Sequence, residues 1–231
     1  MDKAARLRGF HRAPGIDARI STPPAPPPVA IRKRAFDLGV TALLLPVAIP
    51  LLILLALAVW LSDGRPPFFR HRRIGRNGVE FDCLKLRTMV HDADRALAEH
   101  LARSPQARAE WHATRKLRAD PRVLGTLGHF LRRSSLDELP QLLNVLRGEM
   151  SLVGPRPIVR EELARYAGQR RWYLAVRPGL TGPWQVGGRS DAGYADRVRL
   201  DVQYARGSSV RGDVSILLQT ARVVLSGKGA C

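Results

Sequence analysis

The 231-residue chain has few cysteines, few acidic residues and few aromatic residues, and these shortages narrow the class of protein. Two cysteines, Cys83 and Cys231, cannot build a disulfide framework, which fits a reducing cytosol. Only 20 Asp and Glu stand against 38 Lys and Arg, so the formal net charge is +18. This excess predicts an anionic partner, namely nucleic acid, acidic lipid headgroups or a phosphorylated substrate. The sequence lacks zinc-ligand spacing, a basic region followed by heptads and an aromatic-rich RNA motif, so we expect no nucleic-acid partner.

The chain does contain one long apolar run, Leu38 to Leu61, which carries no charged residue. It exceeds the roughly 20 apolar residues that span a bilayer. Basic residues, which favour the cytoplasmic side of a membrane, lie at both ends of the run: Arg32, Lys33, Arg34, Arg65, Arg70, Arg72, Arg73 and Arg76. Pro46 and Pro50 each remove a backbone hydrogen bond near its middle. The pattern predicts a re-entrant, hairpin-like membrane helix over residues 31–64 that breaks near Pro50, with a kinked single span as the alternative.

The two flanks of the apolar run differ in composition. Residues 1–30 combine arginines with a proline-rich patch and lack periodic apolar positions, so we expect a disordered basic tail. Residues 65–231 are long enough for one globular domain, which we expect in the cytosol. The apolar run itself is no cleavable signal, because it begins at residue 38, is too long and lacks a small-x-small cleavage site. No internal repeat is visible.

A β-hairpin is predicted just after the apolar run. Residues 68–75 and 79–86 flank Arg76-Asn77-Gly78, and an Asn-Gly pair supplies the positive φ angles of a tight turn. The apolar residues that alternate with acidic ones, as in a half-buried strand, are Val79, Phe81 and Cys83. The hairpin ends in the basic stretch 85–89, for which an exposed strand end is the alternative to a binding role.

Two helices are expected between Asp92 and Leu117. Asp92 is a plausible N-cap, and Pro105 interrupts an Ala/Arg/Glu-rich stretch. The histidines in or beside this stretch do not have the spacing of a metal pair and are expected at the surface: His91, His100 and His112. Nothing in this region indicates chemistry.

The C-terminal segment predicts an amphipathic helix with Asp213 as its N-cap. Its apolar positions recur at helical spacing: Val214, Leu217, Leu218, Ala221, Val224 and Leu225. Such a helix either lies on a membrane surface or packs against the domain core. Upstream, residues 177–189 form a Gly/Pro-rich loop, which lets the backbone approach a ligand or merely turns the chain.

Residues 130–157 are the most suggestive of chemistry. Ser135 and Glu138 have the offset of a capping box, which places Asp137 in the first turn of a helix. Two faces of that helix are predicted: Leu139, Leu142, Leu143 and Leu146 as buried, and Asp137, Gln141 and Asn144 as polar. Adjacent residues point about 100° apart, so Asp137 and Glu138 should not address one atom together and should have different roles.

Two interpretations of this acidic pair remain open. First-turn acids often do no more than complement the helix dipole. The helix dipole does not explain why basic residues lie close to the acidic pair: Arg132 and Arg133 upstream, and Arg156 between two prolines downstream. The alternative is a site for phosphate and metal.

The chain resembles the bacterial sugar transferases, the monotopic phosphoglycosyl transferases, from about residue 31 to residue 230. The motifs that carry the resemblance are Lys33-Arg34-Ala35-Phe36-Asp37, the proline-broken apolar run, Pro67-Phe68-Phe69-Arg70, Lys85-Leu86-Arg87-Thr88-Met89, Ser135 to Gln141, Gly154-Pro155-Arg156-Pro157 and Arg177 to Gly182. The implied fold is α+β: a re-entrant membrane helix, and a mainly helical catalytic domain with a small β-hairpin and amphipathic interfacial helices. The family breaks its membrane helix at Ser-Pro, whereas this chain has Ile49-Pro50, which puts the geometry of the break in doubt.

The resemblance implies a reaction and a set of site residues. A UDP-sugar gives its sugar-1-phosphate to undecaprenyl phosphate and releases UMP, through a covalent aspartyl intermediate and with Mg²⁺. Asp137 matches the nucleophile, and Glu138 matches its partner in metal binding or proton handling. The matched cations that we expect around the phosphates are Lys85, Arg87, Arg132, Arg156 and Arg189. A carboxylate nucleophile divides one transfer between two anions into two steps, and cations neutralise the charge.

The resemblance also implies a place, the cytoplasmic face of the bacterial inner membrane, with membrane lipids as neighbours. The alternatives are a non-catalytic, membrane-anchored partner of a polysaccharide assembly complex and a basic protein that binds a membrane surface or nucleic acid. The sequence leaves open the sugar, the pathway (exopolysaccharide, capsule, lipopolysaccharide O-antigen or protein glycan) and whether the chain forms a homo-oligomer.

Overall fold

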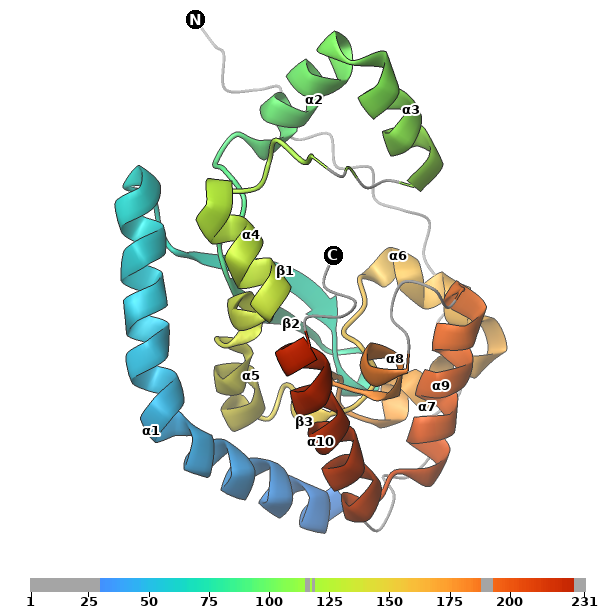
Figure 1. Ribbon diagram of the computed structural model, residues 1–231. Coiled ribbons are helices and arrows are strands. Elements are labelled where there is room, and N and C mark those ends of the chain that lie inside the picture. The colour runs from blue at the N-terminus through green and yellow to red at the C-terminus, as the bar shows by residue number, and fades with distance from the viewer. Residues whose placement is uncertain (1–29, 115–116, 118, 188–192, 227–231) are drawn as a thin grey trace, which may run out of the picture.

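The computed structural model describes residues 30–114, 117, 119–187 and 193–226, which form a helix-rich molecule with two small sheets (Figure 1). The expected tail, 1–30, lies almost wholly outside the described residues. The strands are β1 (Phe68–Ile74), β2 (Glu80–Leu86), β3 (Ser151–Val153) and β4 (Gly179–Thr181). The helices are α1 (Ala30–Asp63), α2 (Ala93–Arg103), α3 (Pro105–Thr114), α4 (Gly125–Ser134), α5 (Gln141–Arg147), α6 (Arg160–Leu163), α7 (Arg170–Ala175), α8 (Pro183–Val186), α9 (Tyr194–Gly207) and α10 (Val210–Ser226). The mixed class expected from the sequence is confirmed.

Helix α1 is one continuous helix of 34 residues that contains Pro46 and Pro50. Figure 1 shows it bent around the edge of the molecule. The expected break at Pro50 does not occur in this helix, which continues through the proline. A proline removes one backbone hydrogen bond and bends a helix, and packing before and after Pro50 keeps the two parts helical. The helix is long and apolar enough to enter a membrane.

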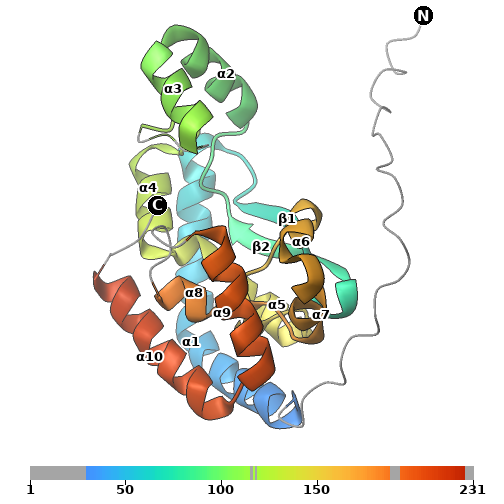
Figure 2. The ribbon, with the colours of Figure 1, turned by 90° about the vertical axis from the view of Figure 1, so that its right-hand side faces the viewer.

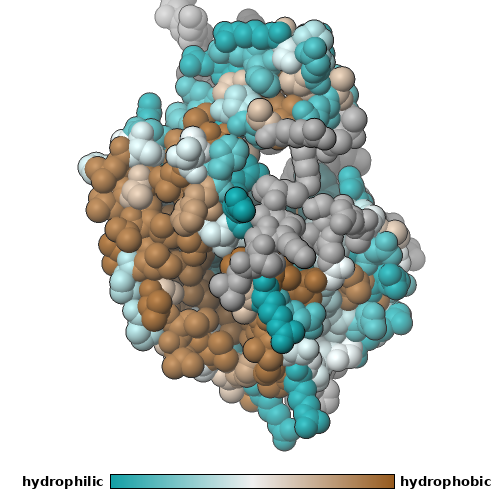
Figure 3. Space-filling view, in the orientation of Figure 1, coloured by the Kyte–Doolittle hydropathy of each residue, from teal (hydrophilic) through white to brown (hydrophobic). Residues whose placement is uncertain are grey.

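The outer face of α1 is apolar and exposed. Leu43 is 78% exposed, Val47 72% and Ile53 64%, and Figure 3 shows a continuous hydrophobic surface on the side of the molecule where α1 lies. Isolated exposed apolar residues are ordinary in soluble proteins, but a large contiguous patch indicates a binding or membrane surface. The inner face of the same helix packs on α4 and α5 through residues such as Ala48 and Val59.

The β-hairpin forms where the Asn-Gly pair predicts it. Strands β1 and β2 pair antiparallel, and Asn77 and Gly78 have φ values of 58° and 77° in the turn. Phe81 and Cys83 are buried as expected. The prediction for Val79 was wrong: its side chain is 66% exposed, because Val79 ends the turn and the strand begins only at Glu80.

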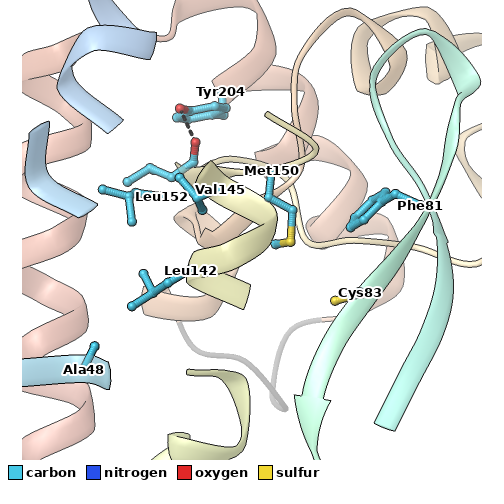
Figure 4. Close-up of a cluster of buried hydrophobic side chains, with 9 residues drawn as sticks. Ala48, Phe81, Cys83, Leu142, Val145, Met150, Leu152 and Tyr204 are labelled. Carbon is cyan, nitrogen blue, oxygen red and sulfur yellow. Dashed lines mark hydrogen bonds between the residues drawn. The ribbon is translucent and has the colours of Figure 1, made fainter. Parts of the chain in front are cut away.

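The core joins α1, α5 and the hairpin (Figure 4). Ala48 faces Leu142 and Val145 of α5, whereas Met150 lies between α5 and the Phe81 side of the hairpin. Fully burying an aliphatic side chain contributes roughly 1.5–3 kcal/mol, so this cluster fixes α1 and the hairpin on opposite sides of α5. The hairpin end and the start of α5 are thereby brought close together.

A second sheet has one of its strands, β4, inside the segment 177–189 that we expected to be a loop. Strands β3 and β4 pair in parallel, with Ser151 opposite Gly179 and Val153 opposite Thr181. A Cβ atom on Gly179 would lie 2.1 Å from the backbone nitrogen of Gly154, so only glycine permits this approach. The pairing places the Gly154–Pro157 motif beside the Gly/Pro-rich segment.

Helix α10 begins at Val210, so the prediction that Asp213 is its N-cap was wrong. The Asp213 carboxylate is fully buried, lies 2.7 Å from the Lys33 ammonium of α1 and accepts a hydrogen bond from the Tyr204 hydroxyl. Such buried partners outweigh a local capping signal. Leu217 packs against the core cluster, whereas Val214 and Leu218 on the outer face are exposed, so the helix packs on the domain and also presents an apolar surface.

Helices α2 and α3 project from the rest of the molecule (Figures 1 and 2). They separate at Pro105 as predicted, and the Ser104 hydroxyl accepts a hydrogen bond from the Ala107 amide in the first turn of α3. His91 and His112 are exposed and His100 is half-buried, with no metal cluster among the described residues.

Candidate active site

A short 3-10 turn, Leu136–Glu138, positions the acidic pair between α4 and α5. Helix α4 ends because Ser135 adopts a left-handed conformation with φ 58°. The predicted capping box was wrong, since the Ser135 side chain makes no cap and its backbone carbonyl instead accepts a hydrogen bond from the Glu138 amide. The turn leaves Asp137 only 8% exposed, at the entrance to α5.

Lys85, at the end of β2, contacts both carboxylates. Its ammonium lies 2.7 Å from Oε1 of Glu138 and 3.5 Å from Oδ2 of Asp137. The expectation that two adjacent acids would not address one atom was therefore wrong. It assumed the directions of a regular α-helix, whereas the residues lie on a 3-10 turn with flexible side chains that converge on a long lysine.

The electrostatic environment of Asp137 favours a basic carboxylate. Burial raises the pKa of Asp137 above its ordinary value, and the negative charge of Glu138 adds to this increase. The positive charges of Lys85 and Arg132 oppose it and lower the pKa. Arg132 is half-buried and makes no ion pair with any other residue that the structure describes. A carboxylate held in this balance has unusual basicity and a cation beside it, which is typical of functional sites.

Further basic residues lie on the face of the hairpin that carries Lys85. Arg73 and His71 on β1 alternate onto the face that carries Cys83 and Lys85, since His71 pairs with Cys83 in the register. Burial lowers the pKa of Arg73, and the positive charge of Arg156 lowers it further. Burial, followed by Arg73 and Lys85, lowers the pKa of His71. Positive charge from Arg73, Arg156 and Lys85 therefore gathers here, and Glu162 lies 3.7 Å from Arg73 as an acidic partner.

Sequence reasoning missed Arg73 and His71 as site residues. We counted Arg73 only among the basic flank of the apolar run. The signal was present, because the period of two along a strand places 71 and 73 on one face, and the Asn-Gly turn fixes the register that brings them opposite 83 and 81.

The other expected cations take different positions. Arg156 stacks over the Trp184 ring, with its guanidinium carbon 5.7 Å from the ring centroid. Arg87 directs its guanidinium to Asp63 at the end of α1, at 2.6 and 2.7 Å, so it holds α1 to the hairpin. Its role in phosphate binding stays a prediction. Arg189 lies outside the described residues.

The polar face predicted on α5 is buried and has a structural role. Asn144 is completely buried; its side chain accepts a hydrogen bond from the Leu84 amide and donates to the Asp82 carbonyl. Gln141 is also buried, and Leu143, predicted to be buried, is 39% exposed. The helix is rotated relative to our expectation because Asn144 satisfies backbone groups of β2.

Neither of two cavities in the described part of the chain is lined by Asp137. One, of about 630 Å³, is lined by residues of α9 and by Gln169. The other, of about 310 Å³, lies between the hairpin turn and the residues 147–149. Asp137 and Lys85 instead lie where the hairpin meets the 3-10 turn, at the edge of the domain.

Comparison with known proteins identifies the class. A family model described as bacterial sugar transferase matches residues 29–227. The exopolysaccharide production protein ExoY of Sinorhizobium fredii is 48% identical over 200 residues, which cover 87% of this chain and 88% of ExoY. An undecaprenyl-phosphate galactose phosphotransferase of Salmonella typhimurium is 48% identical over 198 residues, 86% of this chain and 41% of that protein. An undecaprenyl-phosphate glucose phosphotransferase of Komagataeibacter xylinus is 39% identical over 207 residues, 83% of this chain and 35% of that protein.

An apolar helix joined to a domain with a paired acidic and cationic site thus defines an enzyme of the phosphoglycosyl transferase class. The chain belongs to the bacterial sugar transferase family.

Proposed function

We propose that this enzyme transfers a sugar-1-phosphate from a UDP-sugar to undecaprenyl phosphate, giving undecaprenyl-diphosphate-sugar and UMP. The observation that carries the proposal is the buried Asp137 carboxylate, held with Glu138 around the Lys85 ammonium and next to an apolar membrane-type helix. The names of the Salmonella and Komagataeibacter relatives describe the same kind of acceptor.

The reaction proceeds in two displacements. An Asp137 carboxylate oxygen attacks the β-phosphorus of the donor, and the bond from that phosphorus to the oxygen bridging the two phosphates breaks, so that UMP leaves with the bonding electrons. A phosphate oxygen of the lipid acceptor then attacks the same phosphorus and releases the Asp137 carboxylate. The raised pKa of Asp137 supports this assignment, because a more basic carboxylate is a better nucleophile.

The cations are assigned by the phosphates that they would face. Lys85 would lie against the reacting phosphoryl group, since it already contacts both carboxylates. Arg156 lies close enough to Arg73 for its charge to lower the pKa of Arg73. Together the two guanidinium groups would neutralise the rest of the donor diphosphate. Fixed positive charge of this kind is the main source of catalysis in phosphoryl transfer.

Asp137 and Glu138 also fit a magnesium ion. Mg²⁺ in phosphoryl-transfer sites is commonly bound by one or two carboxylates together with substrate phosphates and water, and Asp137 and Glu138 are two adjacent carboxylates, one buried and one half-buried. When bound, the ion would draw charge from the phosphate oxygens. No larger group of metal ligands occurs among the described residues.

The membrane arrangement follows from the acceptor. The phosphate of a polyprenyl phosphate lies at the headgroup level, so the site has to sit at the interface. We propose that α1 re-enters the cytoplasmic leaflet of the inner membrane through its bend and that α10 lies on the surface with Val214 and Leu218 toward lipid. The similarity to ExoY favours an exopolysaccharide pathway.

The test is UMP release by detergent-solubilised protein with Mg²⁺, undecaprenyl phosphate and a panel of UDP-sugars. At least one sugar should give UMP and a lipid-linked product in equal amounts. After incubation with donor alone, mass spectrometry should find phosphosugar on Asp137. Turnover that needs both substrates together, with no adduct on the protein, would contradict the two-step reaction. Cysteines introduced at residues 30 and 66 should both label from the cytoplasm, and labelling from opposite sides would show a full crossing.

A further inference from the structure

A buried ionic network of Arg197 and Asp201 on α9, together with Tyr166, contacts the backbone of Arg156. Arg197 is 6% exposed and Asp201 is fully buried, and Nε of Arg197 lies 3.8 Å from Oδ2 of Asp201. The Tyr166 hydroxyl donates a 2.6 Å hydrogen bond to the same carboxylate oxygen. Burying two charges costs several kcal/mol, and apolar residues of similar size often give equal stability. The network therefore requires an explanation beyond stability.

The network holds the Arg156 peptide from two sides. Nη2 of Arg197 donates a hydrogen bond to the Arg156 carbonyl at 3.4 Å. The Arg156 amide makes a further interaction with the Asp201 carboxylate and lowers its pKa. Pro155 and Pro157 restrict the backbone on both sides, because each fixes its own φ and Pro157 also limits the residue before it.

Contacts from the rest of the domain complete the support of this motif. The Pro155 carbonyl accepts a hydrogen bond from the Gly179 amide at 2.8 Å, and the Pro157 carbonyl accepts one from Nη1 of Arg73 at 3.3 Å. Three consecutive carbonyl groups, 155 to 157, therefore have partners from β4, α9 and β1. The Arg156 backbone has little freedom to move.

The Arg156 side chain is supported through Trp184. The guanidinium carbons of Arg156 and Arg197 lie 5.7 and 5.2 Å from the centroid of the Trp184 ring. A cation over an indole ring is attracted by about 0.5–2 kcal/mol, so one ring attracts both arginines. Arg197 is thus linked to Arg156 through the backbone and through a shared aromatic ring.

We propose that Arg197 and Asp201 are positioning residues, which fix Arg156 so that its guanidinium binds the phosphates of the sugar-nucleotide donor. The proposal rests on the proposed function, because it needs a diphosphate donor at the site. The competing explanation is that the network only ties α9 to the Ala164–Gln169 segment, in which case it should affect stability alone.

A double-mutant cycle separates these explanations. Arg197→Gln should lower kcat/KM for the UDP-sugar and weaken UDP binding, measured by calorimetry, by about 10-fold each. Arg156→Ala should weaken both at least as much. If Arg197 acts through Arg156, the double variant should match Arg156→Ala alone; losses that multiply would overturn the proposal. The affinity for UDP is measurable even where turnover is too slow.

Further variants keep the test valid if Arg197→Gln folds poorly. Tyr166→Phe removes one hydroxyl from the network, and we expect a loss of about three-fold in UDP affinity that disappears in the Arg156→Ala background. Arg199→Gln is the matched control, since Arg199 lies on the same helix with an exposed side chain paired to Asp196. It should leave UDP affinity unchanged. Equal effects of Tyr166→Phe in both backgrounds would contradict positioning.

The two levels of failure are distinguishable. Wild-type protein that releases no UMP from any UDP-sugar would remove the proposed function and this inference with it. Active wild-type protein with a multiplicative cycle would remove only the positioning role. Variants with lowered melting temperature but unchanged UDP affinity would show that the network is structural.

Discussion

Asp137 and Asp201 are both buried aspartates beside a basic side chain, yet their surroundings differ. Burial is the main cause that raises the pKa of each. Asp201 is closed off by the Tyr166 hydroxyl and the Arg197 guanidinium. Asp137 keeps a small exposed fraction, and Lys85 lies 3.5 Å away. Burial and a raised pKa alone therefore do not identify a nucleophile, because access for a substrate decides the role.

The counter-ions differ in the same sense. A lysine ammonium is a single charge on a flexible stem and can move aside for a phosphate, whereas the planar guanidinium of Arg197 is held between the Trp184 and Tyr194 rings and the Arg156 carbonyl. The comparison predicts that changes at Asp137 affect chemistry and that changes at Asp201 affect stability and substrate affinity.

The largest expected effect is at Asp137. Asp137→Asn should lower transfer of radiolabelled sugar phosphate into lipid extract by about 1,000-fold or more, since a neutral amide replaces the carboxylate nucleophile. We expect no fall in the melting temperature, because burial raises the pKa of Asp137 and so disfavours its charged form. Asp196→Asn, at an exposed position of α9, is the control and should retain activity. Full activity of Asp137→Asn would remove the proposed nucleophile.

The next effect is on stability near Asp201. Its pKa is raised from 3.8 to about 6, mainly by burial and against the opposing effects of Tyr166, Arg197 and Arg156. Its favourable contribution is therefore present below pH 3.8 and is lost as pH rises through 6. The change amounts to about 3 kcal/mol at 1.36 kcal/mol per pKa unit.

Asp201→Asn should lack this component of the pH dependence. Denaturant unfolding of the detergent-solubilised protein between pH 4 and 7 is the measurement, with wild-type protein as the reference. Parallel curves for the two proteins would show that Asp201 does not titrate in this range.

Lys85→Met should have a somewhat smaller effect, a loss of about 100-fold in kcat/KM, as expected for one lost electrostatic donor. Because Lys85 lowers the pKa of Asp137, its removal should also move the acid limb of the pH–rate profile to higher pH. Lys85→Arg should restore part of the rate and most of the profile. An unchanged acid limb in Lys85→Met would show that Lys85 does not influence the pKa of Asp137.

The smallest effect is expected where α1 meets the hairpin. Asp63→Asn removes the charge partner of Arg87 and should cost about 0.5–1 kcal/mol, as for a partly exposed pair. If Arg87 binds phosphate as well, Arg87→Gln should lower kcat/KM beyond the effect of Asp63→Asn. Equal activity of the two variants would show that Arg87 only holds α1 to the hairpin and does not bind phosphate.

Features set by local chemistry were predictable from the sequence. The Asn77-Gly78 turn fixed the hairpin, and Pro105 separated α2 from α3. The acidic pair was singled out from its residues and Lys85 was named through the family resemblance, and the structure brings the three side chains together.

Features that depend on distant partners were not predictable. Asn144 looked like part of a polar face, but its partners Leu84 and Asp82 are about 60 residues away in sequence. Asp213 was predicted to be an N-cap because the local sequence does not show its actual partners, Lys33 and Tyr204. Strands of three residues, such as β3 and β4, are too short for a periodic signal.

The contact between Lys33 and Asp213 has a consequence for biosynthesis. The two residues are 180 positions apart, so a ribosome has made nearly all of the chain before the lysine meets its carboxylate. Until then the start of α1 lacks its ion pair with α10, and closing so large a loop is slow. The start of α1 is therefore joined to α10 late in synthesis, after the segment 145–151 that also contacts it has been made.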